Sequence, residues 1–148
     1  MEAKQFREEL LCMTRVIQGM ISASFAPVCR EHDLSIQQMR ILLSLLHEPG
    51  QTVGELSDST QVLRNNITGV CKKLEQRDLL RRVRSDKDER VVMVWLTRQG
   101  EDLMEQIEDE IEIRYGEIFD QEPDETYGII EAGMKKLCEL LEKMQEAD

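Results

Sequence analysis

Three features that define large classes of proteins are missing from this 148-residue sequence. No apolar run approaches the roughly eighteen residues that a membrane-spanning helix needs, and the first residues lack the basic-then-apolar layout of a signal peptide. The four cysteines are widely spaced and form no Cys-x-x-Cys pair, which argues against a structural zinc site and against a secreted disulfide framework. These absences predict a globular, cytoplasmic protein without a membrane segment.

Catalytic motifs are absent as well. The sequence contains no glycine-rich phosphate loop, no Gly-x-Ser-x-Gly and no His-Glu-x-x-His. Its two histidines, His32 and His47, have no obvious acid–base partners. Cys29 and His32 are three residues apart, but two ligands do not make a metal site. We therefore expect no enzyme, no metal and no cofactor.

Charge is distributed unevenly along the chain. The net charge is −11, yet residues 60–98 contain ten Lys and Arg against five Asp and Glu, a net charge of +5. Residues 1–59 carry −3 and residues 99–148 carry −13. An acidic body repels a polyanion from every face except the basic one, so this pattern favours docking of DNA in a single orientation.

The basic segment contains the pattern of two helices joined by a turn. Thr52 and Glu55 fit a capping box that begins a short helix. A second helix is predicted from Arg64 to Gln76, because Ile67, Val70, Cys71 and Leu74 recur at helical spacing and form one buried stripe. Its opposite face carries amides, a hydroxyl and ammonium groups without a carboxylate. Such a face suits a DNA groove, because cations bind phosphates and planar amides read base edges.

A β-hairpin is predicted after this second helix. Residues 80–84 and 91–97 have strand-like composition, and in the second run Val92, Val94 and Leu96 alternate inward while Val91, Met93 and Trp95 alternate outward. The charged turn 85–90 joins the two runs. The whole segment is therefore predicted to be a winged helix-turn-helix, in which Asp88 and Arg90 leave the same face of the hairpin tip and the carboxylate directs the guanidinium.

Residues 74–80, the Asp88-Glu89-Arg90 tip and the run 94–100 (Val-Trp-Leu-Thr-Arg-Gln-Gly) together resemble the multiple-antibiotic-resistance regulator (MarR) family of transcription factors, and the similarity extends over the whole chain. The resemblance implies a homodimer that binds a pseudo-palindromic operator in double-stranded DNA, with recognition helices in the major groove and wing arginines in the minor groove. Leu63 and Asp78 stand where the family often has a Ser or Asp helix cap and a turn glycine. The expected DNA-binding residues are Arg64, Asn65, Asn66, Thr68, Lys72, Lys73, Arg84, Lys87, Asp88 and Arg90.

Long helices are predicted on both sides of the winged region. Apolar residues recur from Phe6 to Val28, with Pro27 expected to bend the helix, and a further helix begins at the Ser35 capping box and stops at Pro49-Gly50. After Thr97 a fifth helix is expected, and after Pro123 a sixth. The sixth carries a seam of Tyr127, Ile130, Met134, Leu137, Leu141 and Met144, spaced as in a heptad repeat. Such a seam requires a partner, either a second subunit or another part of the same chain.

The expected fold is mainly α with a small β-hairpin wing, in a single MarR-like domain over residues 1–148. Residues 35–98 form the DNA-binding region, and residues 1–31 and 101–148 form dimerisation helices. The predicted function is a dimeric, sequence-specific transcriptional regulator, a repressor that responds to a small molecule. Met13, Met20, Phe25, Ile36 and Met39 could line an effector pocket or simply belong to the core.

Two alternative functions remain open at this stage. Peroxide-sensing members of the MarR family carry a reactive cysteine in the first helix, near the position of Cys12, together with activating tyrosines. Here Phe25 and Ile36 stand near the expected tyrosine positions, and Cys12 lies beside an apolar stripe, as an inert thiol would. The other alternative is a winged-helix module that binds a protein instead of DNA. The basic segment and the Arg90 tip argue against it.

Overall fold

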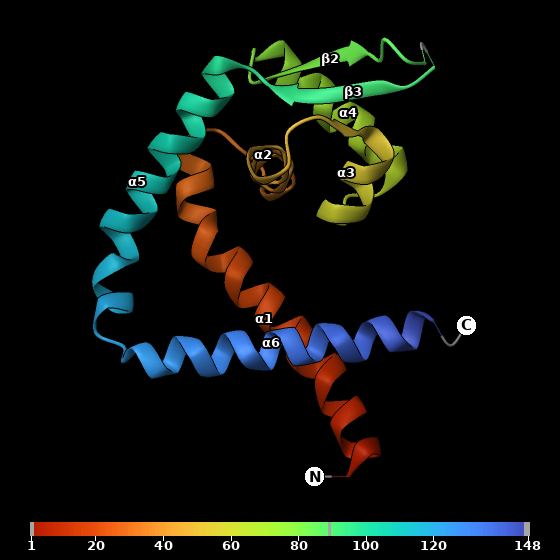
Figure 1. Ribbon diagram of the computed structural model, residues 1–148. Helices are drawn as coiled ribbons and strands as arrows, with labels where there is room; N and C mark the ends of the chain where they lie inside the picture. The colour runs from red at the N-terminus through yellow and green to blue at the C-terminus, as the bar shows by residue number, and fades with distance from the viewer. Residues whose placement is uncertain (1, 89, 147–148) are drawn as a thin grey trace. The chain divides into compact units, whose positions relative to one another are not determined.

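The computed structural model describes residues 2–88 and 90–146, within which six helices and three short strands occur (Figure 1). The helices are α1 (Ala3–Glu31), α2 (Ile36–His47), α3 (Val53–Thr60), α4 (Arg64–Gln76), α5 (Arg98–Asp120) and α6 (Asp124–Gln145). The strands are β1 (Gln51–Thr52), β2 (Leu80–Arg84) and β3 (Val92–Leu96). The chain divides into two compact units, Met1–Glu110 and Ile111–Asp148. The first unit contains the elements of the winged helix-turn-helix: α3, α4 and the β2–β3 hairpin.

Side-chain caps fix where α2 and α3 begin. The Ser35 hydroxyl accepts the amide of Gln38 at 3.1 Å, and the Gln38 side chain accepts the Ser35 amide at 2.8 Å. Thr52 and Glu55 repeat the arrangement at the start of α3, at 3.1 and 2.7 Å. Both predicted capping boxes are confirmed. Each satisfies two backbone donors that would otherwise lack a partner at a helix start.

The sheet is antiparallel and has the strand order β1-β3-β2. The expected hairpin is confirmed, except that the predicted second strand was one residue too long at each end: Val91 precedes β3 and Thr97 follows it. The strand β1 was not predicted. It is only two residues long and polar, so it gives no apolar alternation. Gln51 is nevertheless buried, because its side-chain amide donates to the carbonyl oxygens of Ser44 and Glu48 at 3.0 and 2.8 Å.

The turn before β1 requires a glycine. Gly50 has a φ of 77°, a conformation that side chains disfavour. A Cβ atom at this position would also lie 2.5 Å from the ring of Trp95. Trp95 therefore packs directly over the Gly50 backbone, and this contact fixes the start of β1 against β3.

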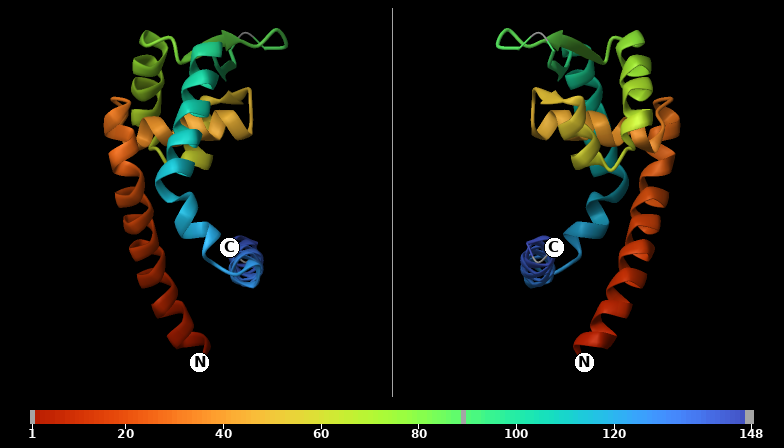
Figure 2. Two further views of the ribbon diagram at one scale, coloured as in Figure 1. Left: turned by 90° about the vertical axis from the view of Figure 1, so that its left-hand side faces the viewer. Right: turned by 90° about the vertical axis from the view of Figure 1, so that its right-hand side faces the viewer.

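The core of the first unit lies between the end of α1, α2, α3, α4, the sheet and the start of α5. Its fully buried side chains are Val28, Ile41, Leu42, Leu45, Leu56, Ile67, Cys71, Leu74, Leu80, Val94, Met104 and Ile107. The predicted inner stripe of α4 belongs to this set, apart from Val70, which is half-buried. Burying the stripe turns the opposite face of α4 outward. Figures 1 and 2 show α4 and the β2–β3 hairpin at one end of the unit.

The helix α1 is apolar but mostly exposed. It runs through Pro27 to Glu31, and only Val28 and Cys29 are buried along it. It contains an eighteen-residue window with a mean hydropathy of 1.2, which suffices by length and composition to cross a membrane. The prediction that no stretch approaches that requirement is therefore wrong on composition. A single such helix is weak evidence for a membrane span, because core helices of soluble proteins and signal sequences near the N-terminus meet the same criterion.

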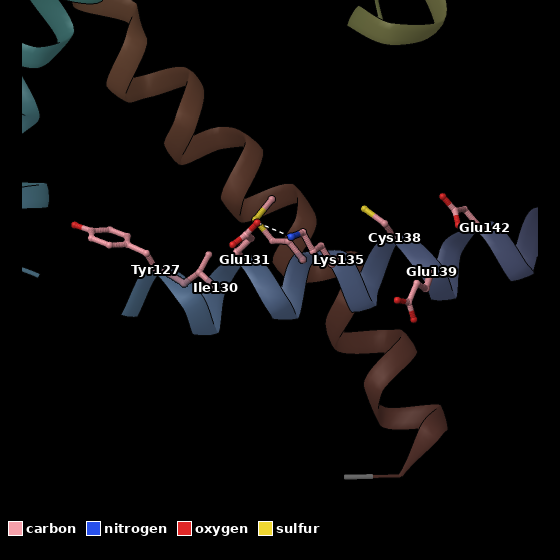
Figure 3. Close-up of a pocket in the computed structure, with 8 residues that line it drawn as sticks. Tyr127, Ile130, Glu131, Lys135, Cys138, Glu139 and Glu142 are labelled. Atoms are coloured by element: carbon pink, nitrogen blue, oxygen red, sulfur yellow. Dashed lines mark ion pairs between the residues drawn. The ribbon is translucent and has the colours of Figure 1, made fainter. Parts of the chain in front are cut away.

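The helix α6 has no buried residue in the single chain. Tyr127, Ile130, Met134 and Cys138 line one shallow groove along it, together with the charged residues Glu131, Lys135, Glu139 and Glu142 (Figure 3). Within this set Lys135 and Glu131 form an ion pair at 2.6 Å. Five of the six seam residues predicted from the sequence are exposed on α6, and the sixth, Leu137, is half-buried; the exposed ones are Tyr127, Ile130, Met134, Leu141 and Met144.

Candidate nucleic-acid interface

The helix α4 presents the polar face that its sequence predicts. Its exposed residues are Arg64, Asn65, Asn66, Thr68, Gly69, Lys72, Lys73 and Gln76. None of them is acidic, and the one carboxylate of the helix, on Glu75, turns toward β2. The face therefore offers planar amides, a hydroxyl and two ammonium groups along one side of a rigid helix. These are the groups that bind base edges and phosphates.

The first turn of α4 has no side-chain cap. Leu63 occupies the N-cap position, and its carbonyl accepts the amides of Asn66 and Ile67 at 2.8 and 3.0 Å. Arg64 extends toward Asp58 of α3 at 3.5 Å, with both side chains largely exposed. The helix thus begins where the sequence predicts, although Leu63 cannot accept the backbone donors that a Ser or Asp cap would accept.

The other end of α4 is attached to α1 and α5. Arg77 donates from its guanidinium to the carbonyl oxygens of Asp33 and His32, at 2.8 and 3.0 Å, and Gln99 donates to the Arg77 carbonyl at 3.2 Å. Asp78, where the MarR family often has glycine, adopts the left-handed conformation with a φ of 56°. Aspartate tolerates this conformation better than most residues do. The helix α4 is thereby fixed at its C-terminal end.

An ion pair joins α4 to the wing. The Arg82 side chain donates to Glu75 Oε2 from Nε at 2.9 Å and from an Nη at 2.6 Å, while the Arg82 amide donates to Glu75 Oε1 at 3.2 Å. These hydrogen bonds lower the pKa of Glu75 and raise that of Arg82. Sequence analysis did not single out Arg82. Arg82 lies opposite the buried Val94 in the sheet and pairs with Glu75 on α4, a partner on another element that no local sequence pattern indicates.

We expect Glu75→Gln to lower stability by about 1 kcal/mol at neutral pH, since both side chains of the pair are about a third exposed and solvent screens them. A carboxyl group whose pKa is lower in the folded protein stabilises the fold at pH values above its unfolded pKa, near 4.5. This stabilisation is lost as the pH falls through the folded pKa. The stability difference between wild type and Glu75→Gln, measured by thermal unfolding, should therefore shrink below about pH 4.5. Glu108→Gln, which changes an exposed carboxylate on α5, is the control. A difference independent of pH would contradict the assignment.

The wing tip is shaped by Asp88, but not in the way the sequence suggests. The Asp88 carboxylate accepts the backbone amide of Arg90 at 3.0 Å, and the Asp88 carbonyl accepts the amide of Val91 at 2.9 Å. Among the described residues no ion pair joins the Asp88 and Arg90 side chains. The expected carboxylate–guanidinium contact is therefore corrected, because the tip follows a tight turn instead of a strand-like path. Glu89, between them, lies outside the described residues.

A shallow hollow lies where α3, α4 and the wing meet. Thr52 and Gly54 line it from the start of α3, Thr68 lines it from α4, and Arg82 and Arg90 line it from the hairpin. Val53, Val91 and Val92 complete its lining. The hollow thus brings Thr68 and Arg90, which are 22 positions apart in the sequence, onto one surface rich in hydrogen-bond donors.

All ten residues expected to bind DNA lie in the first unit and are exposed. Six of them are on α4: Arg64, Asn65, Asn66, Thr68, Lys72 and Lys73. The other four are in the hairpin: Arg84 ends β2, and Lys87, Asp88 and Arg90 lie in the turn before β3. In this turn the Lys87 amide donates to the Ser85 hydroxyl at 3.2 Å. Of the four, only Arg90 lines the hollow beside α4.

The cysteines and histidines have other surroundings. His32 Nε2 lies 2.9 Å from a carboxylate oxygen of Glu110 on α5, so the expectation that His32 has no acid–base partner is wrong. Burial raises the pKa of Cys29, and it raises the pKa of Cys71 to about 11. Both are therefore protonated thiols at neutral pH. Cys12, expected to lie beside the apolar stripe of the first helix, is exposed on α1 within one chain.

Comparison with known proteins gives consistent results. Residues 23–107, more than half of the chain, match the family described as transcriptional regulator SarA/Rot. The chain is 31% identical over 98 residues to the HTH-type transcriptional regulator FarR of Neisseria gonorrhoeae, covering 66% of this chain and 67% of FarR. It is 29% identical over 119 residues to the homoprotocatechuate degradative operon repressor of Escherichia coli, covering 80% and 76%.

The crystal structure of NadR in complex with 4-hydroxyphenylacetate matches with a TM-score of 0.79 at 22% identity. The match covers 91% of this chain and 98% of that one. At this identity the comparison shows a shared fold and nothing more.

Proposed function

Because the chain belongs to the SarA/Rot family of transcriptional regulators and has the winged helix-turn-helix fold of MarR proteins, we propose that it represses transcription as a homodimer bound to a pseudo-palindromic operator. That it is a DNA-binding regulator follows from the family. The observation that carries the finer proposal is the outer face of α4, which is free of carboxylates and lies beside the wing in an otherwise acidic chain. We also propose that the protein acts in the cytoplasm.

The proposed docking puts α4 in the major groove. Asn65 and Asn66 then face base edges, while Arg64, Thr68, Lys72 and Lys73 bind at or near phosphates. Arg90 extends from the wing toward the adjacent minor groove, with Arg84 and Lys87 on the flanking backbone. The Glu75–Arg82 pair supports this arrangement, because it connects the recognition helix to the wing and sets the distance between the two reading elements.

The proposed dimer uses α1 and α6. Met13, Ile17, Met20 and Ile21 are exposed on α1, and Tyr127, Ile130, Met134, Leu141 and Met144 are exposed on α6. Apolar surface on this scale marks an interaction site in a globular protein. A second subunit covers these faces under the proposal and places two recognition helices about one turn of the DNA apart.

A small-molecule effector is the last part of the proposal. NadR, which shares the fold, was crystallised with 4-hydroxyphenylacetate, and the repressor from E. coli is named for homoprotocatechuate degradation. We propose that this chain also responds to a small ligand. Of the residues considered for a pocket, Met13 and Met20 are exposed, Phe25 and Ile36 are half-buried and Met39 is buried, so their burial does not single out a site.

Substitutions on α4 test the mode of DNA binding. Asn65→Ala or Asn66→Ala should cost about 1–3 kcal/mol on a duplex selected from random sequences by the wild type, with relaxed specificity at one position. Lys72→Ala should instead weaken all sequences alike and reduce the salt slope by about one. Lys4→Ala removes an exposed lysine from outside the basic segment and is the control. Equal losses on selected and random DNA for both asparagines would assign them to the DNA backbone or to solvent.

A further inference from the structure

The glycine in the middle of the recognition helix has no reason to be glycine within the protein itself. Gly69 is exposed on α4, and a Cβ atom built at this position meets nothing within 4 Å. Among the described glycines only Gly50 has a positive φ, so Gly69 has no conformational need to lack a side chain. Glycine is a worse helix former than any residue except proline. Alanine at this position would therefore give a more stable free protein.

Two other glycines are required by the protein's own packing, because a Cβ atom at either position would collide with neighbouring atoms. A Cβ atom at Gly50 would lie 2.5 Å from Trp95, and one at Gly100 would lie 2.0 Å from the carbonyl oxygen of Leu79. The other glycines with nothing within 4 Å are Gly19 on α1 and Gly128 and Gly133 on α6. These are the two helices whose faces the proposed dimer covers. Open glycines in this chain thus occur on helices proposed to contact another molecule.

The position of Gly69 identifies what approaches it. Asn65 precedes it by four residues and Lys72 follows it by three, so the three residues form one line along the outer face of α4. Thr68 lies beside this line and opens into the hollow at the wing. Gly69 is therefore central on the face, where the helix backbone comes nearest to whatever the face binds. Phosphates lie at the edges of a groove, and base pairs form its floor.

We propose that the backbone of α4 at Gly69 lies in contact with base-pair edges on the floor of the major groove, and that the missing side chain sets how deeply the recognition helix enters. The inference rests on the proposed function, because it assumes that α4 enters the groove. Gly69 is then a positioning residue: it brings Asn65 within hydrogen-bonding distance of a base and carries no hydrogen-bonding side chain of its own.

The series Gly69→Ala and Gly69→Leu separates this role from any effect on folding. Both replacements are better helix formers than glycine, so the melting temperature should stay level or rise, by about 2–4 °C for alanine. Affinity for the duplex selected by the wild type should fall at least about tenfold with alanine, and with leucine it should approach the affinity for random duplex. Gln106→Ala, at an exposed position of α5 outside the proposed interface, should leave both quantities close to wild type.

Several results would overturn the inference. Binding of Gly69→Ala within twofold of wild type would show that nothing approaches the backbone there, and a lowered melting temperature would show that the protein itself needs the glycine. Equal losses on selected and random duplexes would place a phosphate instead of a base pair at this position. If the wild type selects no duplex at all, the proposed function fails. If the wild type selects a duplex and Gly69→Ala binds it equally well, only the inference about Gly69 fails.

Discussion

Replacing Leu137 and Leu141 by aspartate is expected to abolish dimerisation and operator binding together. Both leucines belong to the apolar seam of α6, which has no buried residue within one chain. In the proposed dimer the seam is covered, and a buried carboxylate without a partner costs several kcal/mol. Sedimentation equilibrium at micromolar concentration should show a folded dimer for the wild type, and a monomer or unfolded chain for the variant.

Ala132→Asp is the matched control for introducing a carboxylate into α6. Ala132 is exposed and lies opposite the seam, in line with Glu125 and Glu139. This variant should remain dimeric and bind DNA as the wild type does. A wild-type protein that sediments as a stable, folded monomer would refute the proposed dimer, as would a double aspartate variant that still dimerises.

Removing the wing arginine is the second large effect expected. Arg90→Ala should weaken binding to the selected duplex by about ten- to a hundredfold, because the narrow minor groove of A·T-rich DNA concentrates negative potential around an inserted guanidinium. Arg90→Lys should recover little of the loss, since an ammonium is more strongly hydrated and has no planar fork. Fluorescence anisotropy on duplexes with A·T-rich and G·C-rich flanks measures both changes. If the wild type and each variant bind the duplexes with A·T-rich and G·C-rich flanks with equal affinity, Arg90 does not enter the minor groove and contributes only a general positive charge.

Variants of Asp88 test the wing geometry separately. Because the carboxylate accepts the Arg90 amide, Asp88→Asn keeps an acceptor oxygen in place and removes a charge near DNA. We expect it to bind at least as tightly as wild type. Asp88→Ala removes the acceptor as well and should weaken binding by loosening the turn. If Asp88→Asn weakens binding as much as Asp88→Ala does, the negative charge of Asp88 must act directly on the Arg90 guanidinium. That result would contradict the geometry described above, in which the carboxylate accepts, among the described residues, only the Arg90 backbone amide.

The parts of the fold encoded by neighbouring residues could be predicted from the sequence. The Ser35 and Thr52 capping boxes depend on residues three apart, and the limits of α4 follow from its apolar spacing. The short strand β1 could not be predicted in this way. Its pairing with β3 spans more than forty residues, and its buried member, Gln51, is polar. Only the tertiary hydrogen bonds of the Gln51 amide explain why it is inside.

The candidate interface likewise contains features that local sequence patterns predict and features that depend on contacts between distant residues. Exposure of Asn65, Asn66 and Lys72 follows from helical periodicity alone, and the structure places them as predicted. The Asp88–Arg90 side-chain pairing failed because a hairpin tip need not continue the alternation of its strands. Arg82 was missed because its role depends on Glu75, which lies on a different element. Whether these residues contact DNA stays a prediction.

The measurement that bears most directly on the proposed function is selection of duplex DNA from a random library, followed by the stoichiometry of the complex and its salt dependence. We predict enrichment of an inverted repeat with half-sites about 10 base pairs apart, or a multiple of that distance, bound by two protomers. The affinity should fall steeply as salt rises. A library that yields no enriched sequence, or a complex of one protomer with an asymmetric site, would contradict a dimeric repressor that reads DNA with α4 and the wing.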